Sequence, residues 1–68
     1  MRDVEIRGDM IRLGQLLKLA DVVGDGGEAK ALLAEGVVTV NGEVEERRGR
    51  QLHRGDLVRV GDEELRVS

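Results

Sequence analysis

The chain has 68 residues, which allows one domain with a small core that buries only part of the unfolded surface. It contains no cysteine and one histidine, so neither a disulfide framework nor a zinc cluster is predicted to stabilise it. The net charge of −3 taken alone argues against a nucleic-acid-binding protein. The charged N-terminus and the lack of a long apolar run argue against a secretory signal and a membrane span, so we expect a cytoplasmic protein.

The N-terminal part of the chain predicts a short strand and then a helix. Apolar residues alternate with charged ones near residues 4–7, which is typical of an edge strand. Asp9 is placed to cap a helix whose apolar residues recur with helical spacing over residues 11–20. Gly24 is expected to end this helix.

A second helix is predicted from its two ends. Asp25 and Glu28 have the spacing of a capping box, and Gly36 is placed where a helix ends in a left-handed residue. A glycine-rich loop before a helix can bind phosphate. This loop lacks the Lys-Ser/Thr pair of a phosphate loop, and Asp25 would compete for the same N–H groups, so we interpret it as a connector and cap.

The rest of the chain predicts strands. A β-branched run at residues 37–40 leads into Asn41-Gly42, a strong signal for a tight hairpin turn, and Val44 resumes a strand. Residues 45–54 show no clear period, and two more strands are expected at residues 57–60 and near 64–67. The sequence therefore predicts a single α+β domain over residues 1–68, with a two-helix hairpin packed on a small, mostly antiparallel sheet.

Charge is distributed unevenly along this chain. Residues 47–54 carry four arginines and no acid, whereas the other residues carry seven basic and 14 acidic groups. The four are Arg47, Arg48, Arg50 and Arg54. Clustered arginines suit phosphate oxygens, because each guanidinium presents a planar fork of donors. The alternative is a solvated basic face paired with the nearby acids Glu43, Glu45 and Glu46.

No catalytic or metal-binding motif is found. The chain has one serine, Ser68, and its one histidine, His53, lies among the arginines. Adjacent acids such as Glu45-Glu46 point in different directions, which is typical of solvated surface. We expect a non-catalytic protein without a metal or a cofactor. Because phenylalanine, tyrosine and tryptophan are absent, bases cannot stack on aromatic rings, and any bound RNA should be structured.

The strings RLGQLLKLADVVGDGGEAKALLAEGVVTVNG and RGDLVRV, within residues 11–60, resemble the RNA-binding domain named after small-subunit ribosomal protein S-four. The resemblance is greatest to small stand-alone bacterial members. It implies a helix pair on a strongly curved sheet, with RNA bound along the helices and the adjoining loop. Many members have Ser-Arg where this chain has Asp25 and Gly26, which shifts the expected site toward the arginine loop.

The resemblance and the charge pattern together predict non-catalytic binding of structured ribosomal or transfer RNA, with the ribosome as a further candidate partner. The alternative is a protein-interaction module that docks on a ribosome-associated factor or an RNA-modifying enzyme. The candidate RNA-binding residues are Arg47, Arg48, Arg50, Arg54, Lys30, Arg12, Lys18, Asn41 and Gly42.

Overall fold

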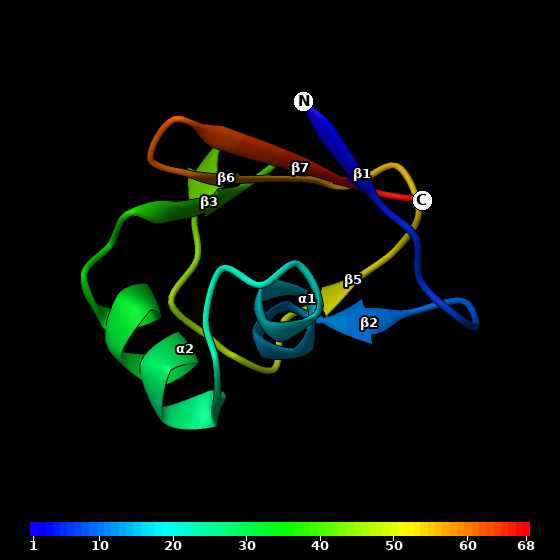
Figure 1. The fold of residues 1–68 in the computed structure, drawn as a ribbon. Helices are drawn as coiled ribbons and strands as arrows, with labels where there is room; N and C mark the ends of the chain where they lie inside the picture. The colour runs from blue at the N-terminus through cyan, green and yellow to red at the C-terminus, as the bar shows by residue number, and fades with distance from the viewer.

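The computed structural model describes residues 1–68 and shows two helices below a five-stranded sheet (Figure 1). The strand order is β1-β7-β6-β3-β4, in which β1 runs parallel to β7 and every other pair is antiparallel. A separate two-stranded sheet pairs β2 with β5 beside α1. The predicted α+β class is confirmed. The elements are β1 (Arg2–Val4), β2 (Ile11–Arg12), α1 (Leu13–Leu19), α2 (Gly26–Ala34), β3 (Val38–Val40), β4 (Glu43–Val44), β5 (Gln51–Leu52), β6 (Leu57–Val60) and β7 (Glu63–Val67).

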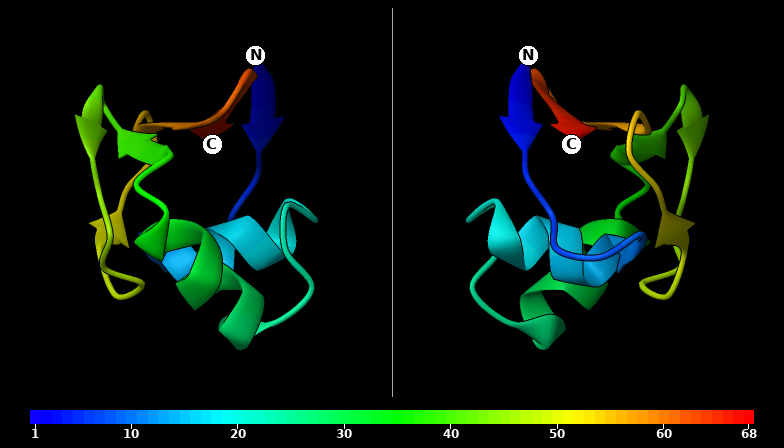
Figure 2. Two further views of the ribbon diagram at one scale, coloured as in Figure 1. Left: turned by 90° about the vertical axis from the view of Figure 1, so that its left-hand side faces the viewer. Right: turned by 90° about the vertical axis from the view of Figure 1, so that its right-hand side faces the viewer.

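The core lies between the large sheet and the helices, which occupy the same side of it (Figure 2). Leu13, Leu16 and Leu17 of α1 and Leu33 of α2 are fully buried. Alternate residues of the strands point toward them, as the two-residue period of a strand requires. The fully buried strand residues are Val38, Val40, Leu52, Val58, Leu65 and Val67.

The first helix is shorter than the sequence predicts. Ile11 and Arg12 form β2 and pair with β5, so the helix starts at Leu13 and the predicted cap at Asp9 is wrong. The helix also ends before Gly24, because Asp21 adopts a left-handed conformation with φ of 60°. Aspartate tolerates this conformation better than most residues, and it stops the helix there.

The second helix and the hairpin turn agree with the sequence prediction. The Asp25 side chain accepts a hydrogen bond from the Glu28 N–H at 2.8 Å and caps α2. Gly36 follows the helix with φ of 74°. Asn41 and Gly42 both have positive φ, as a tight turn between β3 and β4 demands.

Four of the five strands that follow α2 were predicted, namely β3, β4, β6 and β7, with some of their ends shifted. The first strand covers Arg2–Val4 rather than residues 4–7, because β1 aligns with β7 from Arg2 opposite Leu65. The last strand already begins at Glu63. β5 was not predicted at all, since its two residues are paired only with the distant strand β2.

Candidate nucleic-acid interface

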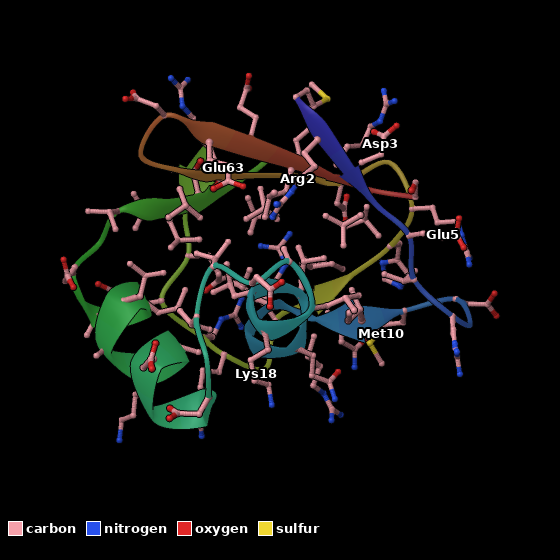
Figure 3. The ribbon with its side chains drawn as sticks, in the orientation of Figure 1. Arg2, Asp3, Glu5, Met10, Lys18 and Glu63 are labelled. Atoms are coloured by element: carbon pink, nitrogen blue, oxygen red, sulfur yellow. The ribbon has the colours of Figure 1, made fainter.

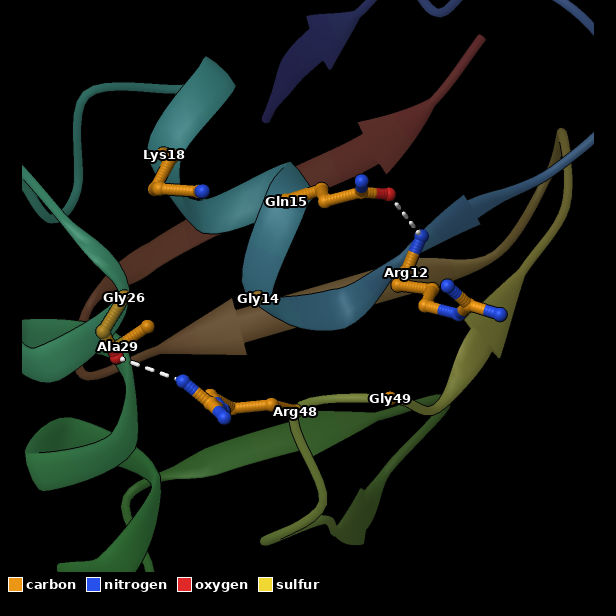
Figure 4. A pocket seen from close by; sticks show the side chains of 8 residues that line it. All are labelled: Arg12, Gly14, Gln15, Lys18, Gly26, Ala29, Arg48 and Gly49. Carbon is orange, nitrogen blue, oxygen red and sulfur yellow. Dashed lines mark hydrogen bonds between the residues drawn. The ribbon is translucent and has the colours of Figure 1, made fainter.

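A groove of about 250 Å³ lies between the start of α1, the start of α2 and the loop from β4 to β5 (Figure 4). Three of the residues that line it are basic and none is acidic. The groove is formed by the fold, because its lining residues come from three separate parts of the chain. The lining residues are Arg12, Gly14, Gln15, Lys18, Gly26, Ala29, Arg48 and Gly49.

Arg48 forms hydrogen bonds with the first residues of both helices. Its carbonyl oxygen accepts a hydrogen bond from the Gly14 N–H at 3.0 Å, and the Arg50 carbonyl accepts one from the Leu13 N–H at 2.8 Å. The guanidinium Nη1 of Arg48 donates to the Gly26 carbonyl oxygen at 3.3 Å (Figure 4). A Cβ at Gly14 or Gly26 would lie 3.5 or 3.3 Å from an atom of Arg48. Arg48 therefore packs closely against the backbone of both glycines.

The basic side chains of the groove have no acidic partner. Arg12, Lys18 and Arg48 take part in none of the ion pairs of the protein. Lys18 extends from the side of α1 that faces away from the sheet (Figure 3). Their charge is therefore uncompensated and directed to solvent, where it can attract phosphate oxygens. The arginines that do form ion pairs are Arg2, Arg47, Arg50, Arg54 and Arg66.

Glu45 is the one buried charged residue and lies under the arginine loop, with 7% of its surface exposed. Its Oε2 accepts hydrogen bonds from the N–H groups of Glu46 and Arg47, each at 3.1 Å. The Arg47 guanidinium donates to both carboxylate oxygens, and Arg50 Nη1 donates to Oε1 at 3.0 Å. The hydrogen bonds from Arg47 and then from Arg50 lower the pKa of Glu45 from 4.5 to about 2.

Two comparisons with known proteins agree with this architecture. A family model described as S4 domain matches residues 4–68 of the chain. The protein belongs to the S4 domain family. The probable ribosome maturation protein RlbA of Bacillus subtilis (strain 168) is 53% identical to it over 57 residues, which cover 84% of this chain and 80% of that protein. The resemblance inferred from the sequence is therefore confirmed, and this S4 domain is an RNA-binding domain.

The four loop arginines of this S4 domain do not point to one place. Only Arg48 lines the groove with Arg12 and Lys18. Arg47 and Arg50 are engaged by Glu45, although Arg47 keeps 76% of its side chain exposed. Arg54 donates to the Ile6 carbonyl oxygen at 3.1 Å and does not line the groove. The sequence groups these arginines, and the structure separates them.

Three further predicted residues lie outside the groove. Lys30 is exposed and follows Gly26 by four residues, which places it on the same side of α2 as the groove. The Asn41 side chain accepts from the Leu57 N–H at 2.9 Å and donates to Asp56 at 3.1 Å. Gly42 completes the turn. Asn41 and Gly42 thus shape the hairpin between β3 and β4.

Sequence reasoning missed Gln15 as a lining residue and interpreted Glu45 as solvated surface. Gln15 carries no charge, and its Oε1 accepts from the Arg12 N–H at 3.3 Å (Figure 4). The alternative that pairs the arginines with nearby acids is correct for Glu45, whereas Glu43 and Glu46 form no ion pair. The signal for Glu45 was its place within reach of two arginines.

The structure contains no group of three or more His, Cys, Asp or Glu side chains arranged to hold a metal ion. Neither helix has the length and apolar character needed to cross a membrane.

Proposed function

We propose that this S4 domain binds structured ribosomal RNA through the groove, that it acts in the cytoplasm during ribosome maturation, and that it catalyses no reaction. The observation that carries the proposal is the set of three unpaired basic side chains around one groove. The name of the Bacillus relative supports the ribosomal setting.

Arg12, Lys18 and Arg48 would contact phosphate oxygens, with Lys30 at the margin of the groove. Contacts of this kind recognise the backbone and shape of an RNA helix rather than its sequence. The absence of aromatic residues fits this mode, because single-stranded bases have no ring to stack on. Binding should therefore weaken steeply with salt.

The test compares two triple variants that lose the same charge. One carries Arg12→Ala, Lys18→Ala and Arg48→Ala in the groove. The control carries Arg7→Ala, Arg59→Ala and Arg66→Ala, which lie outside it. Affinity is measured by fluorescence anisotropy with a labelled RNA hairpin from ribosomal RNA and by co-sedimentation with isolated ribosomal subunits, over a series of salt concentrations.

The groove variant should bind far more weakly than the control. Its salt slope should fall by up to ~0.9 for each duplex phosphate that the protein no longer neutralises. Equal losses of affinity in the two variants would show that only net charge matters, which contradicts the groove as the site. Co-sedimentation that survives high salt and is unchanged in the groove variant would favour the protein-docking alternative instead.

A further inference from the structure

Resting on the proposed function, we infer that Glu45 is a positioning residue of the RNA site: this acid fixes the loop so that Arg48 enters the groove. An acid beside four arginines should by charge alone repel RNA. Glu45 is nevertheless the most enclosed charged residue of the protein, and it faces the loop rather than the solvent.

The carboxylate of Glu45 binds the loop on both sides of Arg48. Before it, Arg47 donates its backbone N–H to Oε2 at 3.1 Å and its Nη2 to Oε1 at 3.0 Å. After it, Arg50 Nη1 donates to Oε1 at 3.0 Å. The loop itself closes through the Arg50 N–H and the Arg47 carbonyl oxygen at 3.3 Å. Arg48 is thus held at the tip of a turn whose two flanks share one carboxylate.

This turn is anchored at both of its ends. The Glu45 N–H donates to the Val38 carbonyl oxygen at 3.0 Å, which ties the start of the loop to β3. The carbonyl oxygens of Arg48 and Arg50 accept from the N–H groups of Gly14 and Leu13. Glu45 thus holds the two flanks of the turn, while the bond from the Gly14 N–H holds the Arg48 backbone between them. Arg48 itself makes no bond to Glu45, so the acid acts through the backbone.

The turn depends on the negative charge of Glu45, because its hydrogen bonds with Arg47 and Arg50 require a carboxylate. A neutral glutamine has the same shape but replaces one acceptor oxygen with a donor NH₂, which cannot accept from arginine. Hydrogen bonds from ionised donors to a carboxylate are about twice as strong as neutral ones. Glu45→Gln should therefore loosen the turn, even though it makes the protein more positive.

The first experiment sets Glu45→Gln against Glu46→Gln, with the labelled RNA hairpin as the probe. Both variants remove one negative charge from the same loop, but the Glu46 side chain makes no hydrogen bond or ion pair. Glu46→Gln should bind slightly more tightly than the unaltered protein. Glu45→Gln should bind about fivefold more weakly, within the range measured for coupled contacting residues. A gain in affinity in Glu45→Gln equal to that in Glu46→Gln would overturn the inference.

Two further measurements separate positioning from a general loss of fold. In an Arg48→Ala background, Glu45→Gln should cause no loss of affinity and only the slight gain expected for Glu46→Gln, because the residue it positions is gone. An undiminished fivefold loss there would overturn the inference. Amide hydrogen exchange should accelerate at Gly14 and Leu13 in Glu45→Gln while remaining slow at core amides such as that of Val58.

Glu45→Asp is a second variant for the same RNA-binding measurement if Glu45→Gln fails to fold. It keeps the charge, but its shorter side chain cannot span Arg47 and Arg50 as Glu45 does, so RNA binding should weaken at constant net charge. Binding by Glu45→Asp at full affinity would contradict the inference. The proposed function has a separate outcome: it fails if the groove variant binds as the control does, whatever Glu45→Gln shows.

Discussion

Gly14 donates its backbone N–H to the carbonyl oxygen of Arg48 at 3.0 Å, and this bond joins the start of α1 to the tip of the arginine loop. The first N–H groups of a helix have no partner within the helix and must find one elsewhere. Here Arg48 and Arg50 supply the carbonyl oxygens. The start of α1 is therefore satisfied by the loop, and the helix and the groove form together.

The stability of this loop should depend on pH through Glu45. In the folded protein its pKa is about 2, against an ordinary value of 4.5. A lowered pKa means that the unfolded chain takes up the proton first, so this contribution to stability is complete above about pH 5 and is lost as the pH falls toward 2. Urea unfolding over this range should show a steeper loss for the unaltered protein than for Glu45→Gln. Parallel curves would contradict the assigned pairing.

Asn41 should matter for folding and not for RNA binding. Burial alone would raise the pKa of Asp56, but hydrogen bonds from the His53 N–H and the Asn41 amide outweigh it and lower that pKa. Asn41→Ala removes the amide and places alanine at φ of 51°, so it should cost about 2 kcal/mol of unfolding free energy.

Asn41→Gly is the matched variant, because glycine accepts the positive φ and only the side-chain bonds are lost. It should cost less than Asn41→Ala in thermal or urea unfolding. Both variants should bind the RNA hairpin as the unaltered protein does at temperatures where they are folded. A loss of affinity in both variants would show that Asn41 contributes to RNA binding.

Local signals in the sequence were sufficient to predict α2 and the hairpin turn between β3 and β4. Asp25, Gly36 and Asn41 act through bonds or backbone angles within a few residues of themselves, so their roles can be inferred without the rest of the fold. Ile11 is different. Its apolar side chain fits the helical period of the next residues, but its backbone pairs with Leu52, 41 positions away, and only the fold brings that strand into place.

The same limit applies to the site. Arg47 and Arg48 are neighbours with identical side chains, and nothing in their order says which one reaches the groove. The Arg47 guanidinium binds the carboxylate of Glu45. The backbone bond from Gly14 places Arg48 between the helices. Arg12 and Lys18 were candidate RNA-binding residues, and the fold brings both to the groove that Arg48 lines. Their contact with RNA stays a prediction.

The core under the groove should tolerate little change. Leu17 is fully buried, whereas Leu19, two positions later on α1, is 54% exposed. Leu17→Ala should lower the free energy of unfolding by about 2–5 kcal/mol, through lost burial and the cavity left behind. Leu19→Ala should change it by less than about 0.5 kcal/mol. Urea denaturation of the two variants gives the comparison, and similar midpoints would contradict the assigned packing of α1.

Asp25 provides a way to separate stability from RNA affinity at the groove. Its side chain caps α2 through the Glu28 N–H, and the next residue, Gly26, lines the groove. Asp25→Ser keeps a capping oxygen and removes a negative charge, so the fold should persist while affinity rises roughly twofold at low salt, the size expected for one charge about 10 Å away in water. Asp25→Ala removes the same charge but loses the cap, which should cost about 1 kcal/mol of stability.

The control for Asp25 is Asp62→Ser, which removes one acid from the turn between β6 and β7, outside the groove. If the groove is the RNA site, both Asp25 variants should gain affinity for the RNA hairpin and Asp62→Ser should not, because screening confines the effect of an exposed charge to about one Debye length. Equal gains at Asp25 and Asp62 would mean that RNA senses only the net charge of the protein. A gain at Asp25 that disappears in the Arg48→Ala background would locate the bound phosphate beside the start of α2.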